Sequence, residues 1–142
     1  MNSPNQVEWG KIDKNSLDEN CAYEQFYTKS FNESVAMFER NALYYQEDLT
    51  YMPTKPFNFY VKAFVKYILS DKAKGDSDGA SSFLSMVEWK LKTEIDIIPN
   101  DIEQLLISTS KEISNNQQFY EADKDIYGDF LKKYDKIKQY ER

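Results

Sequence analysis

The chain has 142 residues, of which 41% are hydrophobic and 15% aromatic, and its formal net charge is −6. This length and apolar content suffice for one core without disulfide bonds or metal ions, and they argue against a disordered chain. An acidic average surface repels a phosphate backbone, and no run of several basic residues occurs, so we expect no nucleic-acid ligand.

Three features bear on where the protein works. Residues 1–6 lack the basic and apolar regions of a secretory signal, and the most apolar stretch, residues 57–69, is too short to cross a bilayer. Cys21 is the only cysteine, so no internal disulfide can form, and we expect its thiol to be a small buried hydrophobic group. The sequence therefore predicts a cytoplasmic protein without membrane contact.

Apolar residues recur at steps of three and four, and glycine and proline are scarce, with four of each. This pattern predicts an all-α fold, a compact bundle of five or six amphipathic helices in a single domain of residues 1–142. We expect residues 1–14 to form an irregular N-terminal arm, with Val7, Trp9 and Ile12 against the core and Trp9 as the anchor.

Two capping-box patterns predict where the first helices begin. Ser16 precedes Glu19, and Ser30 precedes Glu33, by the three residues that let each side chain satisfy a free backbone N–H. Behind the second box, a regular four-three spacing predicts the clearest core face of the chain. This face consists of Phe31, Val35, Phe38, Ala42, Tyr45 and Leu49.

Pro53 and Pro56 predict a turn, followed by a helix whose apolar face is wide enough for a central position. Residues 74–80 are polar and contain two glycines, which predicts an exposed loop. A fourth helix is expected to begin near Ser81 or Ser82 and to end before Pro99.

The last third of the chain predicts two helices. Asn100 and Glu103 form another capping pattern, which places the start of the fifth helix there. The apolar spacing of residues 119–137, which includes Ile126, predicts one long amphipathic final helix despite Gly128 in its interior.

The chain contains no histidine, the usual general base near neutral pH and the commonest metal ligand. Residues 76–79 resemble the middle of a calcium-binding loop, but that register puts Lys74 at the first ligand position and Ser85 at the last. No glycine-rich phosphate loop occurs either. We therefore nominate no catalytic residue, no metal ligand and no cofactor, and we favour a function other than catalysis.

The first candidate contact site is an acidic ridge near the end of the chain. On a continuous helix, Glu121, Asp125 and Asp129 share one face and repel one another mildly, which a basic partner would relieve, and Tyr120 lies beside them as an aromatic anchor. An ordinary solvated face is the simpler explanation, because acids early in a helix complement its dipole.

The second candidate contact site is the cluster of Tyr44, Glu47, Asp48 and Tyr51. These acids stand at a predicted helix end, where they oppose the dipole, so local helix stability does not explain them. Chance surface composition is the competing explanation.

Together these features predict an acidic protein-binding module that docks on a basic protein partner. An inhibitor or immunity-type protein that neutralises a nuclease toxin fits that description. The alternatives are a carboxylate-dependent hydrolase that uses Mg²⁺ or Ca²⁺ without histidine, and a helical adaptor that self-associates. The sequence does not determine the oligomeric state.

Overall fold

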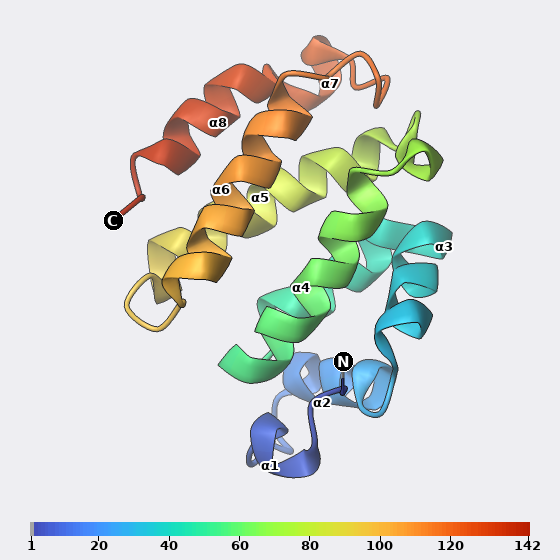
Figure 1. The fold of residues 1–142 in the computed structure, drawn as a ribbon, viewed down its shortest axis with the longest axis vertical. Coiled ribbons are helices and arrows are strands. Elements are labelled where there is room, and N and C mark those ends of the chain that lie inside the picture. Colours follow the sequence, from blue (N-terminus) through green and yellow to red (C-terminus); the bar gives the residue numbers. More distant parts are fainter. Residues whose placement is uncertain (1) are drawn as a thin grey trace. The chain divides into compact units, whose positions relative to one another are not determined.

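Every regular element in residues 2–142, the part of the chain that the computed structural model describes, is helical (Figure 1). The elements are α1 (Gln6–Trp9), α2 (Leu17–Phe26), α3 (Phe31–Thr50), α4 (Thr54–Ile68), the 3₁₀-helix η1 (Asp71–Ala73), α5 (Ser77–Glu94), α6 (Asn100–Ser114), α7 (Lys124–Tyr127) and α8 (Phe130–Lys138). The all-α prediction is confirmed, but five or six helices is too few, because short helices also form at α1 and α7. None of the helices in residues 2–142 has the length and hydropathy of a membrane span.

The chain divides into two compact units at the end of α4, where the first unit ends at Tyr67 and the second begins at Ile68. The first unit has an aromatic core, in which the Phe38 ring lies 5.8 Å from that of Phe26 and stacks 4.7 Å from that of Phe64. Helix α2 packs against α3 in this unit. These rings come from three helices, so the core joins α2, α3 and α4.

The N-terminal arm is anchored by Trp9, as predicted. The Trp9 ring is buried and meets the Tyr23 ring edge-on at 5.4 Å. The arm is more regular than expected, because Asn5 and Glu8 form a capping box around the short helix α1. The predicted burial of Val7 is wrong, since its side chain is 87% exposed.

The two capping serines begin α2 and α3 as predicted. The Ser16 hydroxyl accepts a hydrogen bond from the Glu19 N–H, and Ser30 forms a complete capping box with Glu33. The core face of α3 is also confirmed, with four of its members buried and the other two, Phe31 and Tyr45, half-buried. The helix is nevertheless kinked at Asn41, whose φ of −164° and ψ of 82° are not helical.

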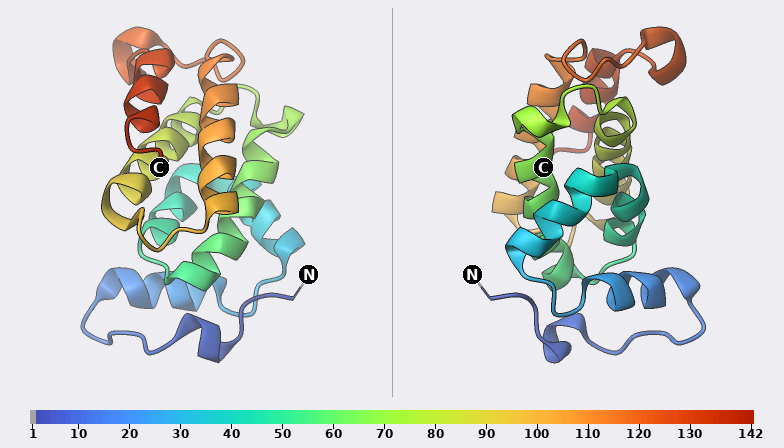
Figure 2. Two further views of the ribbon diagram at one scale, coloured as in Figure 1. Left: turned by 60° about the vertical axis from the view of Figure 1, so that its left-hand side comes forward. Right: turned by 90° about the vertical axis from the view of Figure 1, so that its right-hand side faces the viewer.

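In the second unit, α5, α6 and α8 pack pairwise, and α8 runs back along α6 in the opposite direction (Figures 1 and 2). Helix α5 begins earlier than predicted, because the Asp76 side chain accepts a hydrogen bond from the Gly79 N–H and so caps the helix. The prediction of an exposed loop over residues 74–80 is therefore wrong from Ser77 onward. Gly79 and Ala80 are buried in the first turn of α5.

The prediction of one long final helix over residues 119–137 is wrong. The backbone forms turns over residues 115–121, α7 has four residues, and Gly128 separates α7 from α8 with a φ of 81°. Glycine adopts this conformation readily, whereas it is strained for other residues. Ile126, expected in the core stripe, is exposed.

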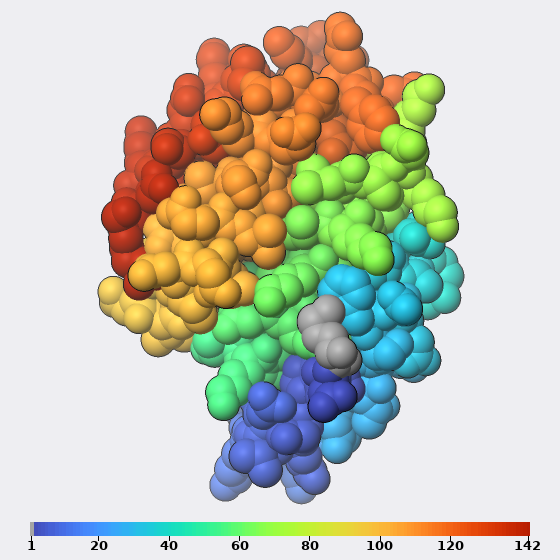
Figure 3. Space-filling model, viewed as in Figure 1, coloured from blue at the N-terminus to red at the C-terminus, as the bar shows by residue number. Residues whose placement is uncertain are grey.

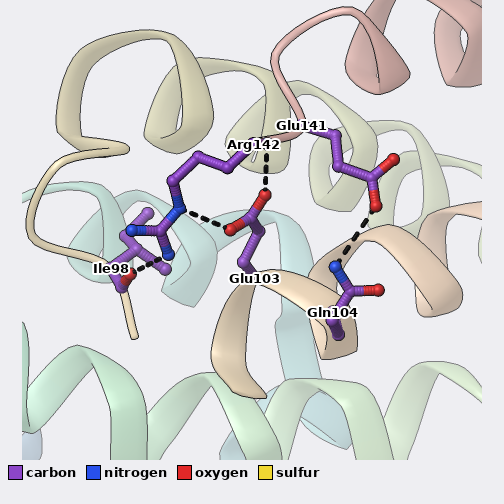
Figure 4. A network of polar contacts seen from close by, with 5 residues as sticks. All are labelled: Ile98, Glu103, Gln104, Glu141 and Arg142. Atoms are coloured by element: carbon purple, nitrogen blue, oxygen red, sulfur yellow. Dashed lines mark hydrogen bonds and ion pairs between the residues drawn. The ribbon is translucent and has the colours of Figure 1, made fainter. Parts of the chain in front are cut away.

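The predicted capping box at the start of α6 does not form. Pro99 occupies the N-cap position of α6, Asn100 is already helical, and no side-chain hydrogen bond caps this end. The Glu103 carboxylate instead accepts hydrogen bonds from Arg142 (Figure 4). The spacing of Asn100 and Glu103 fits a capping box, but Arg142, far along the chain, binds the Glu103 carboxylate instead.

Candidate functional site

Helix α6 lies at the surface of the second unit, where Figure 3 shows it in orange. One face of this helix borders a groove of about 490 Å³. Three segments line the groove: the stretch after α4, α6 itself, and the turns that follow α6. The lining residues are Leu69, Asp71, Leu105, Ser108, Thr109, Glu112, Asn116, Phe119 and Tyr120.

The helical repeat explains why α6 contributes this wall. Leu105, Ser108 and Glu112 follow one another at steps of three and four, so they share a side of the helix, and Asn116 follows in the turn after α6. Ser108, Glu112 and Asn116 are exposed and Leu105 is half-buried, whereas the strongly apolar residues of α6 point into the unit. The groove wall is therefore the polar face of an amphipathic helix with an apolar edge.

Two hydrogen bonds fix the opposite rim of the groove. The Tyr120 hydroxyl donates to the Ile68 carbonyl oxygen at 2.7 Å, and the Gly75 N–H donates to the Phe119 carbonyl oxygen at 3.0 Å. The first bond satisfies a carbonyl group at the C-terminal end of α4, which has no partner within the helix. Both tethers hold the turns after α6 against the residues that follow α4, so the groove has fixed walls.

The groove is acidic and partly apolar. Its lining residues, all within residues 2–142, include the carboxylates of Asp71 and Glu112 and no basic side chain. Leu69 and Phe119 supply apolar wall beside those carboxylates, and the Leu69 side chain is exposed. Such a lining suits a cationic side chain with an apolar stem, because the stem contacts the wall while the charged head meets a carboxylate.

Tyr120 is a wall residue rather than an exposed anchor. Its side chain is 2% exposed, and burial together with the nearby Glu112 carboxylate raises the pKa of its hydroxyl to about 12. The hydroxyl therefore stays protonated at neutral pH and keeps its hydrogen bond to α4. The prediction that Tyr120 is an exposed aromatic anchor is therefore wrong, although Tyr120 does line the groove.

A second hollow, of about 800 Å³, lies on the first unit between the N-terminal arm and α2. Its lining combines Lys11 and Lys14 with Asp13. Mixed charges at one site favour no particular sign of ligand, so this hollow is larger but less selective than the groove along α6.

The predicted acidic ridge is not formed by the structure. Glu121 lies in a turn with a φ of 53°, Asp125 lies in α7, and Asp129 is the N-cap of α8, so they do not share a helical face. The Asp129 carboxylate accepts a hydrogen bond from the Leu131 N–H, which gives it a local structural role. Glu121 lies against Gly75, where an added Cβ would come within 2.5 Å of the Glu121 carboxylate oxygen.

The second predicted cluster is largely at the surface. Tyr44, Glu47 and Tyr51 are exposed at the end of α3, and the side chain of Leu43 is exposed beside them. We call these four residues the α3 face. Asp48, predicted as a fourth surface contact, is only 5% exposed and is not part of this face.

Asp48 instead belongs to a polar cluster between α2 and α3. The Gln25 amide donates to the Asp48 carboxylate at 2.6 Å and to the Cys21 sulfur at 3.1 Å. Burial raises the pKa of Asp48 to about 7, and the charges of Glu47 and Asp18 add to the effect. A buried acid with this pKa is partly protonated at neutral pH.

Cys21 is exposed, so the prediction of a buried thiol is wrong. Partial desolvation and the nearby Asp48 carboxylate raise the pKa of the thiol. A raised pKa lowers the population of thiolate, the reactive form. The local environment therefore does not activate Cys21 as a nucleophile.

Sequence reasoning missed Asp71 and Glu112. The spacing of polar residues along residues 105–116 indicates the exposed face of a helix, and that signal was available for Glu112. Nothing local marks Asp71, because its place in the groove depends on the turn after α6. In residues 2–142, no three carboxylate or thiol side chains converge in a way that could hold a metal ion.

Comparison with known proteins finds no matching family model, no similar curated protein and no similar solved structure.

Proposed function

We propose that this protein is a binding module for a basic protein partner, and that the groove along α6 receives a cationic, partly apolar segment of that partner. One observation supports this most directly: Asp71 and Glu112 line a groove with apolar walls and no basic lining residue. The net charge of −6 favours encounter with a cationic surface, because long-range attraction raises the rate of association.

The finer proposal is an inhibitor or immunity-type protein that neutralises a nuclease-like toxin. Nucleases carry cationic surfaces for their substrate, and a small acidic protein is complementary to such a surface. Expression of this protein together with the captured basic partner should then restore growth or remove nuclease activity. A captured partner whose activity is unchanged would contradict the inhibitor proposal but leave the binding proposal intact.

The groove is tested by neutralising its acids. Asp71→Asn with Glu112→Gln removes two charges from the groove, while Asp96→Asn with Asp135→Asn removes two exposed charges of the same unit outside it. Tagged wild type and both variants are used for affinity capture from native cells, at low and moderate salt, followed by mass spectrometry. We expect a basic protein to be retained by wild type and by the control, and lost by the groove variant.

Equal recovery by the groove variant would show that the partner binds elsewhere. Equal loss from both variants would mean that net charge, and not the groove, determines binding. If wild type and control retain no common basic protein, the binding proposal itself fails.

A second contact surface is proposed at the α3 face. Its Tyr44 and Tyr51 side chains are exposed next to Leu43 and Glu47, and tyrosine is enriched where proteins bind one another. Tyr44→Ser with Tyr51→Ser should weaken capture of the same partner without changing the helix content measured by circular dichroism. Unchanged capture would remove this surface from the proposal.

A further inference from the structure

The buried carboxylate of Glu103 lies near the start of α6, and its side chain is only 2% exposed. Both of its oxygen atoms accept hydrogen bonds from one residue. Oε1 lies 2.7 Å from Nε of Arg142, and Oε2 lies 2.8 Å from the backbone nitrogen of Arg142. A buried charge of this kind is tolerated only when it is paired and hydrogen-bonded.

A second acceptor completes the geometry around the guanidinium group. Nη2 of Arg142 donates to the Ile98 carbonyl oxygen at 2.6 Å, so carboxylate and carbonyl bind two different nitrogen atoms of the same planar group (Figure 4). A lysine ammonium group carries its three donors on one nitrogen atom, so it cannot present two nitrogen atoms in one plane to these two acceptors. The site therefore selects for arginine by shape as well as by charge.

The segment that delivers Arg142 is held by surface contacts. Helix α8 ends at Lys138, and Glu141 contacts Gln104 at 3.2 Å and Lys138 at 3.0 Å. Exposed ion pairs and hydrogen bonds of this type contribute little stability. The Arg142 side chain itself remains 40% exposed, and the contacts that hold residues 139–142 outside the site are weak. Withdrawal of Arg142 would leave the Glu103 carboxylate buried and unpaired, and an incoming arginine that makes the same bonds offsets that cost while the acceptors stay in α6 and the loop before it.

We propose that Glu103 and the Ile98 carbonyl form an arginine-recognition site, which Arg142 fills within this chain and which an arginine of a protein partner fills in its place. The site lies on the opposite side of α6 from the groove, because Glu103 and Leu105 are two residues apart on the helix. It does not depend on the groove, and either site can fail its test without the other.

The test is chemical rescue of full-length Arg142→Ala with N-acetylarginine methylamide in the millimolar range, using N-acetyllysine methylamide as the matched probe. The variant leaves the Glu103 carboxylate buried without its partner, so its melting temperature should fall. The arginine probe should restore the melting temperature in a saturable way, with an affinity at least about tenfold higher than that of the lysine probe. Wild type should show a much smaller shift, because its site is filled.

Glu103→Gln combined with Arg142→Ala is the control that links rescue to the carboxylate. Rescue of this double variant, equal rescue by both probes, or no rescue of Arg142→Ala would each overturn the proposal. If Arg142→Ala does not fold, the wild type carries the test through the NMR signal of the Arg142 Nε–H group. Excess arginine probe should shift that signal toward the position of a free guanidinium group, and an unchanged signal would contradict exchange at the site.

Discussion

Asp48 and Glu103 are acids whose side chains are almost completely buried, and they differ in their hydrogen-bond partners. The guanidinium group of Arg142 pairs with Glu103 directly, whereas the neutral amide of Gln25 donates to Asp48. An amide compensates less of the cost of burying a charge than a cation does. Burial without a cationic partner raises the pKa of Asp48 to about 7.

Asp48 should make stability depend on pH. Its pKa is about 7 in the folded protein against an ordinary value of 3.8, so the folded state binds the proton more tightly than the unfolded state. The stability that the folded protein gains by binding this proton is fully present below about pH 4 and is lost as the pH rises to about 7 and above. Asp48→Asn should therefore raise the free energy of unfolding at about pH 8 by ~1–3 kcal/mol and flatten this dependence.

Urea denaturation at about pH 4.5 and about pH 8 measures the effect, with Glu47→Gln as the control. Glu47 is the exposed neighbour of Asp48, so its neutralisation should leave most of the pH dependence in place. A wild-type pH dependence that survives unchanged in Asp48→Asn would contradict the raised pKa.

At the scale of the elements, tyrosine hydroxyl groups complete two helix ends. The Tyr60 hydroxyl lies 2.8 Å from the carbonyl oxygens of both Phe26 and Lys29, where α2 ends, and Tyr120 binds the last carbonyl of α4. Helix ends leave carbonyl groups without partners, and burying them unsatisfied is costly. These tyrosines therefore act as structural caps that also direct the chain after each helix.

The break at Gly128 can be tested by substitution, because alanine at this position changes the free energy of unfolding in opposite directions in a broken and in a continuous helix. Gly128 has a φ of 81° and a ψ of 176°, a conformation that is nearly restricted to glycine. Gly128→Ala should therefore lower the free energy of unfolding by ~1–3 kcal/mol. In a continuous helix the same substitution would raise it by about 0.5–1 kcal/mol.

Thermal or urea unfolding measures this difference, and Ser85→Ala at an exposed position inside α5 is the matched control. The control should have little effect, because alanine is favourable in a helix. A higher free energy of unfolding for Gly128→Ala would contradict the break at Gly128 and support the predicted continuous final helix with its acidic ridge.

For the molecule as a whole, the negative charge is unevenly divided. Fifteen of the 24 acidic residues and eleven of the 18 basic residues follow Tyr67, so the second unit carries four of the six excess negative charges. The groove belongs to this unit. The attraction of a cationic ligand to the groove should thus be reinforced by the charge around it.

Binding of a short amphipathic peptide of lysine and leucine should consequently depend on salt. We expect its affinity to fall at least about tenfold between about 50 and about 300 mM NaCl, since ions screen attraction between exposed charges. Isothermal titration calorimetry measures the affinity, and Asp71→Asn with Glu112→Gln should reduce both the affinity and its salt dependence. Binding that is equally strong at both salt concentrations would indicate an apolar mode of recognition instead.

The sequence by itself determined the helical class, the starts of α2 and α3, the core face of α3 and the anchoring of the arm by Trp9. The first three follow from interactions between residues close together in the chain or from the helical repeat. The Trp9 anchor follows from the size of its apolar ring, although its contacts with Tyr23 and Tyr60 are tertiary. A capping serine needs only the third residue after it, and an apolar stripe needs only a regular period.

Only the tertiary structure decided which acids are accessible. Residues remote in sequence determine the burial of Asp48 beneath α2, the partnership of Glu103 with Arg142 and the meeting of Asp71 with Glu112. The apolar spacing around Gly128 fits one helix as well as two, so it does not predict the break there. Charge and periodicity indicate which residues of a segment could contact a partner, and packing determines which of those residues are exposed.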